Sequence, residues 1–164
     1  MSELASTQED LDRLANEEEA LQFDRFDRSS GLELGLAMLD AARREQLPLA
    51  ISVRLGHQRV FYAALPGTST DNEDWIARKM RVVERFGHSS YYVGTLFRMR
   101  NDDFTSVSRL DRALFAADGG AVPILVRGVG PIGTVGVSGL PQDEDHAFVV
   151  AQLQSFLALG IQSR

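Results

Sequence analysis

The stretch LPLAISVRLGHQRVFYAALPG, residues 47–67, decides the fold. From Leu49 to Leu55 large apolar side chains alternate with small or polar ones, which is typical of a strand with one buried face. A turn at 56–58 follows, and residues 59–65 are β-branched and aromatic, as strands prefer. Because the connection is so short, the stretch predicts an antiparallel hairpin.

A second hairpin is expected downstream. Residues 122–127 and 132–137 are apolar and β-branched, and the segment between them contains glycine and proline. The segment 128–133 also satisfies the spacing GxGxxG of dinucleotide-binding turns. That motif needs a strand that leads into a helix, whereas here the following residues are strand-like. We therefore interpret 128–131 as a hairpin turn.

Helical patterns surround the two hairpins. The acidic, leucine-containing segment 4–20 predicts a peripheral N-terminal helix. Further helices are expected at about 30–46, 70–86, 89–99 and 141–159, with a short helical turn at 111–116. Two hairpins separated by helices are incompatible with a doubly wound parallel sheet. They predict an α+β protein with helices packed on an antiparallel sheet.

Two of these helices have capping-box patterns at their starts. Ser30 with Glu33 predicts the start of the 30–46 helix, and Thr70 with Glu73 predicts the start of the 70–86 helix. The apolar stripe expected on the first of them consists of Leu32, Leu36 and Leu39, widened by Leu34, Met38 and Ala41.

The composition excludes several classes of chemistry. The 164 residues include no cysteine, so a disulfide framework, a thiolate zinc site and a CxxC redox pair are excluded. The length predicts one domain over 1–164. A polar, acidic N-terminus and the lack of a long apolar run predict a cytoplasmic protein with no membrane partner. The net charge of −6 argues against nucleic-acid binding.

The charge is unevenly distributed. Residues 51–100 carry eight basic and four acidic side chains, and the basic ones concentrate after Trp75. Helical spacing places Arg78, Arg81 and Arg85 on neighbouring turns of one helix face. Together with Arg98, which lies further along the chain, they are candidate ligands for an anion. The alternative is a solvated helix face, or ion pairs with the acidic N-terminal helix of the same or another subunit.

A break between two predicted helices adds polar candidates to this basic face. Gly87 permits the break, and His88, Ser89 and Ser90 follow it. Hydrogen-bonding groups beside a basic face favour a ligand pocket. The alternative is that Ser89 only caps the next helix.

A third group of candidates lies where the last helix begins. Ser138 and Gly139 precede it in a pattern that approaches the GxSxG nucleophile elbow, but Leu140 occupies the final glycine position. Ser138 and Gly139 are therefore candidate ligand contacts rather than catalytic residues. His146 follows three acidic residues, which we interpret as complements of the helix dipole. No metal-ligand spacing is present, so no metal site is predicted.

Four strings in this order resemble the GlcG/HbpS-like superfamily, whose shared domain is described as haem-degrading. They are LPLAISVRLGHQRVFYAALPGTSTDNEDWIARK (47–79), ERFGHSS (84–90), AADGGAVPILVRGVGPIG (116–133) and VSGLPQDEDHAFV (137–149). The resemblance covers about residues 25–160. It implies a profilin-like fold, an antiparallel five-stranded sheet with helices on both faces, whose fifth strand would lie near 21–26. It also implies homo-oligomers and, in some relatives, haem binding.

The residues and the resemblance together leave three functional hypotheses. The first is a homo-oligomeric binding or accessory protein for an anionic small molecule, held by the arginines, by His88, Ser89 and Ser90, and by Ser138 and Gly139. The second is haem or tetrapyrrole handling, with His88 or His146 as ligand or acid–base; haem is the one cofactor that the resemblance implies. The third is a scaffold that binds other proteins. No catalytic residue is assigned, and an enzyme is the less favoured class.

Overall fold

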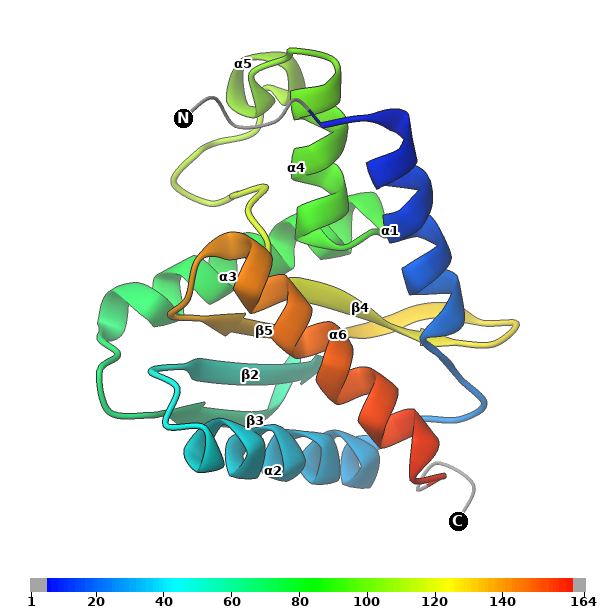
Figure 1. Ribbon diagram of the computed structural model, residues 1–164, viewed down its shortest axis with the longest axis vertical. Helices are drawn as coiled ribbons and strands as arrows, with labels where there is room; N and C mark the ends of the chain where they lie inside the picture. The colour runs from blue at the N-terminus through cyan, green and yellow to red at the C-terminus, as the bar shows by residue number, and fades with distance from the viewer. Residues whose placement is uncertain (1–5, 161–164) are drawn as a thin grey trace.

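A computed structural model describes residues 6–160. Its sheet contains five strands in the order β1-β4-β5-β2-β3 (Figure 1). The strands are β1 (Gln22–Phe23), β2 (Ala50–Leu55), β3 (Gln58–Ala64), β4 (Ala121–Val126) and β5 (Gly130–Ser138). Both predicted hairpins are confirmed, since β2 pairs antiparallel with β3 and β4 pairs antiparallel with β5. The two hairpins join where β2 pairs antiparallel with β5.

The strand near 21–26 that the resemblance implied is present, but its direction differs from the all-antiparallel expectation. β1 lies at the edge of the sheet and pairs parallel with β4, with Gln22 opposite Leu125. The sheet is therefore mostly antiparallel with one parallel pair, in an α+β fold. The strand follows α1 (Gln8–Ala20), which lies at one end of the molecule (Figure 1).

Helices cover both faces of the sheet. On one face α2 (Arg28–Arg44) and α6 (Gln142–Ala158) pack on a large apolar cluster that includes Phe23, Ile51 and Phe156. On the other face α3 (Thr70–Phe86) buries a smaller cluster. Away from the sheet, α1 runs beside α4 (Ser90–Met99), and the short α5 (Phe104–Ser108) follows α4 (Figure 1). Within residues 6–160 no helix is both long and apolar enough to cross a bilayer.

The predicted helix starts need correction. Asp27 caps α2: its Oδ1 accepts a hydrogen bond from the Ser30 amide at 3.0 Å, and Ser30 Oγ accepts one from the Asp27 amide at 3.1 Å. Ser30 therefore closes the capping box rather than opening one with Glu33, and α2 begins earlier in the sequence than that pattern indicates. At α3 the cap is Ser69 rather than Thr70, because Asn72 Oδ1 accepts from the Ser69 amide at 2.9 Å.

The buried face of α2 also differs from the predicted stripe. Leu32 and Leu36 are exposed, whereas Leu34 and Met38 are fully buried. The physical reason is close packing on β3: a Cβ at Gly35 would lie 2.2 Å from the Phe61 ring. The helix therefore turns its glycine side to the sheet and leaves two leucines in solvent.

The segment between α4 and β4 contains the predicted helical turn at 111–116, since the amides of Leu114 and Phe115 both donate to the Asp111 carbonyl at 2.9 Å. The short helix α5, which the sequence did not predict, lies before this turn. Asp103 fixes this position, because its Oδ2 accepts a hydrogen bond from the Ser106 amide at 2.8 Å. Residues 109–120 then run as turns and extended chain back to the sheet, past α3.

Candidate functional site

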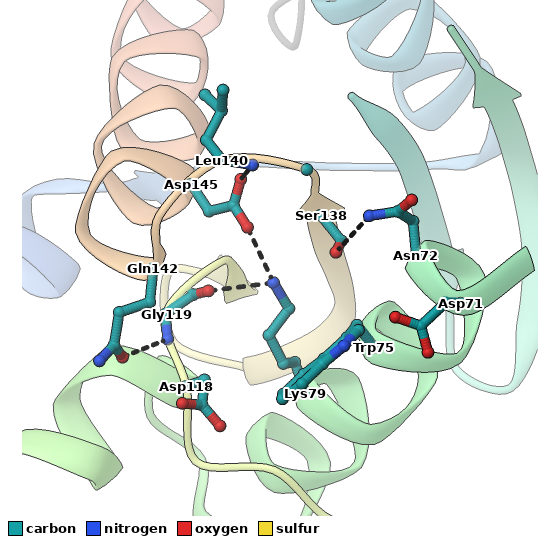
Figure 2. A pocket seen from close by; sticks show the side chains of 11 residues that line it. Asp71, Asn72, Trp75, Lys79, Asp118, Gly119, Ser138, Leu140, Gln142 and Asp145 are labelled. Carbon is teal, nitrogen blue, oxygen red and sulfur yellow. Dashed lines mark hydrogen bonds and ion pairs between the residues drawn. The ribbon is translucent and has the colours of Figure 1, made fainter. Parts of the chain in front are cut away.

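Two adjoining pockets lie on the α3 side of the sheet, and Trp75 and Asp118 line both. The first, which we name the lysine pocket, has a volume of about 290 Å3. It lies between α3, the 118–119 segment and the start of α6 (Figure 2). Its lining residues are Asp71, Asn72, Trp75, Lys79, Asp118, Gly119, Ser138, Gly139, Leu140, Gln142 and Asp145.

Lys79 stands at the back of the lysine pocket and is almost completely buried. Its Nζ donates to the carbonyl oxygens of Gly119 at 3.0 Å and Val137 at 2.6 Å, and to Asp145 Oδ2 at 3.1 Å (Figure 2). An ammonium group has three N–H donors, so these three acceptors use all of them. Lys79 thus ties α3 to β5, to the loop before β4 and to α6.

Asp145 completes this buried pair. Its other oxygen, Oδ1, accepts a hydrogen bond from the Leu140 amide at 3.0 Å, just before α6 begins. Burial lowers the pKa of Lys79 and raises the pKa of Asp145, while the attraction between the two groups opposes both shifts. The close approach depends on Gly120, whose φ is +131° and where a Cβ would lie 2.3 Å from Nζ.

Two further hydrogen bonds hold the wall of the lysine pocket. Asn72 Nδ2 donates to Ser138 Oγ at 3.2 Å, which joins the first turn of α3 to the end of β5. Gln142 Oε1 accepts from the Gly119 amide at 3.0 Å. The predicted contacts Ser138 and Gly139 therefore line this pocket. The hydroxyl of Ser138 is held by a side-chain amide rather than by a base.

The second pocket, which we name the arginine pocket, has a volume of about 540 Å3. It is enclosed by α3, α4, α5 and the chain from 112 to 118. Three arginines, three acids and several aromatic rings line it: Trp75, Arg78, Gly94, Phe97, Arg98, Asp102, Asp103, Phe104, Thr105, Ser106, Arg112, Phe115, Ala116, Ala117 and Asp118. The pocket combines guanidinium donors with an aromatic wall.

The two predicted arginines in this pocket are only partly engaged. Arg78 Nε donates to Asp74 Oδ2 at 2.8 Å, and its Cζ lies 4.0 Å from the centre of the Trp75 ring. Arg98 Nη2 donates to Thr95 Oγ1 at 2.9 Å. Among residues 6–160, no hydrogen bond uses the two terminal nitrogens of Arg78. Each guanidinium therefore has its orientation fixed and still has N–H groups available to a ligand.

The remaining predicted residues line neither pocket. Arg81 Nη1 donates to the Leu114 carbonyl at 3.1 Å, and Arg85 is exposed on α3. Ser90 Oγ accepts from the Ala121 amide at 3.1 Å and so joins α4 to β4.

The two histidines among the candidates contact α1 instead. His88 Nδ1 lies 2.7 Å from Glu18 Oε2, and the other oxygen of Glu18 accepts from the Ser89 amide at 2.7 Å. The hydrogen bond from Glu18 raises the pKa of His88. His146 Nε2 lies 2.7 Å from Glu17 Oε1. The acidic N-terminal helix thus pairs with these histidines rather than with the predicted arginines of α3.

Sequence reasoning missed the buried pair and the aromatic residue at the centre of the site. Lys79 is the one lysine of the chain and lies in the apolar pattern of α3, between Ile76 and Met80. A charged residue at such a position signals a buried partner. Its partner Asp145 is 66 residues away, and among three consecutive acids no pattern identifies which one is buried.

Comparison with known proteins identifies the family of the chain. The family model described as "haem degrading protein HbpS-like" matches residues 26–154, which is most of the chain. This chain belongs to the HbpS-like family. A UPF0303 protein of Streptomyces coelicolor is 46% identical over 153 residues, covering 93% of this chain and 97% of that one.

Solved structures support the HbpS-like fold. The crystal structure of Ybr137w protein matches with a TM-score of 0.86 at 30% identity, over 95% of this chain and 92% of that one. The crystal structure of a PduOC:Heme complex matches with a TM-score of 0.63 at 15% identity, over 74% and 88% of the two chains. At that level of identity the likeness concerns the fold.

The residues that line the two pockets do not fit a haem iron. Neither lining contains a histidine, a methionine or a tyrosine, which with cysteine are the usual axial ligands. His88 and His146 each have one ring nitrogen on a glutamate of α1. His57 lies on a separate, smaller pocket of about 170 Å3 at the β2–β3 turn. We therefore derive no haem chemistry from this site.

Proposed function

We propose that the protein binds a small molecule whose carboxylate or phosphate group is held in the arginine pocket by Arg78 and Arg98. The observation that carries the proposal is the meeting of these two arginines in one pocket with an aromatic wall. They come from different helices, α3 and α4. The haem complex of a distant relative of the same fold supports ligand binding as a property to test in this family.

The chemistry of the lining supports an anionic, partly apolar ligand. A guanidinium presents a planar set of donors that matches carboxylate and phosphate, and charge-assisted hydrogen bonds of this kind are about twice as strong as neutral ones. Phe97 and Phe104 lie edge to face, with their ring centres 5.0 Å apart, and Phe115 joins them in the lining. An aromatic or aliphatic body of the ligand would pack on these rings.

Isothermal titration of the purified chain with 4-methylbenzoate and phenyl phosphate tests the proposal. Loss of one charge-assisted hydrogen bond costs about 1.5–3 kcal/mol, so Arg98→Gln should weaken binding by about tenfold or more. The matched control is Arg127→Gln, because Arg127 is exposed on the β4–β5 turn and pairs there with Asp24. Equal affinity of the wild type and Arg98→Gln for both probes, or no binding of either by the wild type, would overturn the proposal.

Self-association, a cytoplasmic location and a role as a protein scaffold stay predictions. Sedimentation velocity of the purified chain tests the first of them. Leu32 and Leu36, which lie exposed on α2, are the apolar residues to change if a dimer or larger assembly is found. None of these predictions alters the test of the arginine pocket.

A further inference from the structure

We infer that the lysine pocket binds a cationic end of the same ligand. The ligand would then be a zwitterion, with an ammonium or guanidinium group separated from its carboxylate or phosphate. This inference rests on the proposed function for the anionic end. It rests independently on the charge of the lysine pocket for the cationic end.

Among the described residues, the lysine pocket offers no free cationic donor to an anion, although a lysine lines it. All three N–H donors of Lys79 are used by Gly119, Val137 and Asp145. The Lys79–Asp145 pair is neutral as a unit. An anion that entered the pocket would meet this closed pair without a free donor from it.

The other charges in the lining are negative. Asp71 and Asp118 both face the pocket and lie on opposite sides of Lys79 and Trp75 in Figure 2. Within residues 6–160, neither carboxylate forms an ion pair. Two carboxylates without a cationic partner leave the pocket with a negative charge, which a ligand cation would neutralise.

The positive end of the α6 dipole does not reverse this charge. The first turn of α6 contains Asp143, Glu144 and Asp145, which offset the dipole. Asp145 also accepts from the Leu140 amide, one of the donors at that end of the helix. The polar groups on Asn72 and Ser138 bond to each other.

Trp75 and Asp118 make the two pockets one site. Both residues line both pockets, so a ligand seated on Arg78 and Arg98 extends past Trp75 toward Asp71 and Asp118. An indole ring attracts a cation, as the guanidinium of Arg78 already demonstrates on this ring. The arginine pocket thus presents three guanidinium groups together with three carboxylates, whereas the lysine pocket, within the described part of the chain, presents Asp71, Asp118 and Trp75 without a free cation.

Three probes separate the two ends: 4-methylbenzoate, 4-(aminomethyl)benzoate and benzylamine. We expect the added ammonium to make 4-(aminomethyl)benzoate bind about tenfold more tightly than 4-methylbenzoate. Asp118→Asn should remove this gain, measured as the ratio of the affinities for the two probes in the same variant, because Asp118 also lines the arginine pocket and its change can alter both affinities. Asp102→Asn is the matched control, because Asp102 lines the arginine pocket alone. The longer 4-(2-aminoethyl)benzoate extends the reach of the ammonium.

Each outcome has a separate meaning. If 4-methylbenzoate binds, and neither 4-(aminomethyl)benzoate nor 4-(2-aminoethyl)benzoate binds more tightly than it does, the inference about the cationic end is wrong and the proposed function stands. If Asp102→Asn removes the gain while Asp118→Asn keeps it, the ammonium lies in the arginine pocket and this inference is overturned. If benzylamine binds in an Asp118-dependent manner and 4-methylbenzoate does not bind, the cationic end stands and the proposed anionic end fails.

Discussion

The two faces of the sheet bury different kinds of side chains. Under α2 and α6, large side chains such as Leu34, Leu153 and Phe156 pack into one continuous apolar cluster. Under α3 the buried apolar residues are few, and a buried lysine and its aspartate take up space beside them. Both pockets of the candidate site lie on this second side.

The two faces are held by different interactions. The α2–α6 side gains stability from every buried methyl group, and a pocket of about 350 Å3 borders its cluster, lined in part by Ala42, Leu47 and Leu65. The α3 side instead fixes its backbone by directed hydrogen bonds to Lys79 Nζ, and it keeps open space in front of them. We expect both faces to contribute to stability and the α3 side to bind the ligand.

The largest effect is expected at the buried pair. Lys79→Ala leaves Asp145 buried without its cation, which should lower the free energy of unfolding by about 3–5 kcal/mol. Urea unfolding measures the loss. The control is Arg127→Ala, which breaks an exposed pair with Asp24 and should cost no more than about 1 kcal/mol.

A second variant separates lost charge pairing from lost packing. Lys79→Met together with Asp145→Asn removes both charges and keeps most of the side-chain volume. This double variant should therefore recover at least about half of the free energy of unfolding that Lys79→Ala loses. A Lys79→Ala protein as stable as Arg127→Ala would show that the pair does not hold the α3 side.

Truncation on the opposite face should cost slightly less. Leu153 is fully buried in the α2–α6 cluster, and Leu153→Ala should lower the free energy of unfolding by about 3 kcal/mol through lost contacts and a residual cavity. The affinity of the folded fraction for 4-methylbenzoate should stay unchanged, because Leu153 lines neither pocket. A loss of affinity that matched the loss in Arg98→Gln would mean that the two faces are coupled.

Much of the fold could be predicted from the sequence because its hairpins follow the simple alternation of strands. The face of α2 could not, because Gly35 carries no apolar signal and its role depends on the Phe61 ring of β3. The two-residue strand β1 is too short for any periodicity and was expected from the family resemblance alone.

The site could be predicted only in part, for a similar reason. The basic stretch of α3 and α4 indicated Arg78 and Arg98, which do share a pocket. Trp75 has the spacing of a packing residue, and nothing near it in sequence identifies Asp118 as its neighbour. The lysine pocket is assembled from segments that lie far apart in the chain, and such an arrangement leaves no local pattern.

The smallest expected effect concerns the contact of α1 with the α4 start. Glu18 raises the pKa of His88 above its usual 6.5, so the folded protein holds that proton more tightly than the unfolded chain. This stabilisation is complete below about pH 6.5 and is lost as the pH rises through the raised pKa. After solvent screening of the half-exposed ring it amounts to no more than about 1 kcal/mol.

Thermal unfolding of the wild type and Glu18→Gln at pH 6 and pH 9 measures this contribution. The difference in Tm between the two proteins should be larger at pH 6. The amide side chain introduced by Glu18→Gln keeps an acceptor oxygen for the Ser89 amide, so the pH-dependent part reports on His88. A difference that is equal at both pH values, or larger at pH 9, would contradict the ion pair.

Ligand binding in the arginine pocket is tested most directly by mapping the amide chemical shifts of isotope-labelled protein titrated with 4-methylbenzoate. We expect shifts that concentrate in α3, in α4 and in residues 112–119, and that disappear in Arg98→Gln. Shifts that concentrate on α2 and β3, or a spectrum that the probe leaves unchanged at saturating concentration, would contradict it.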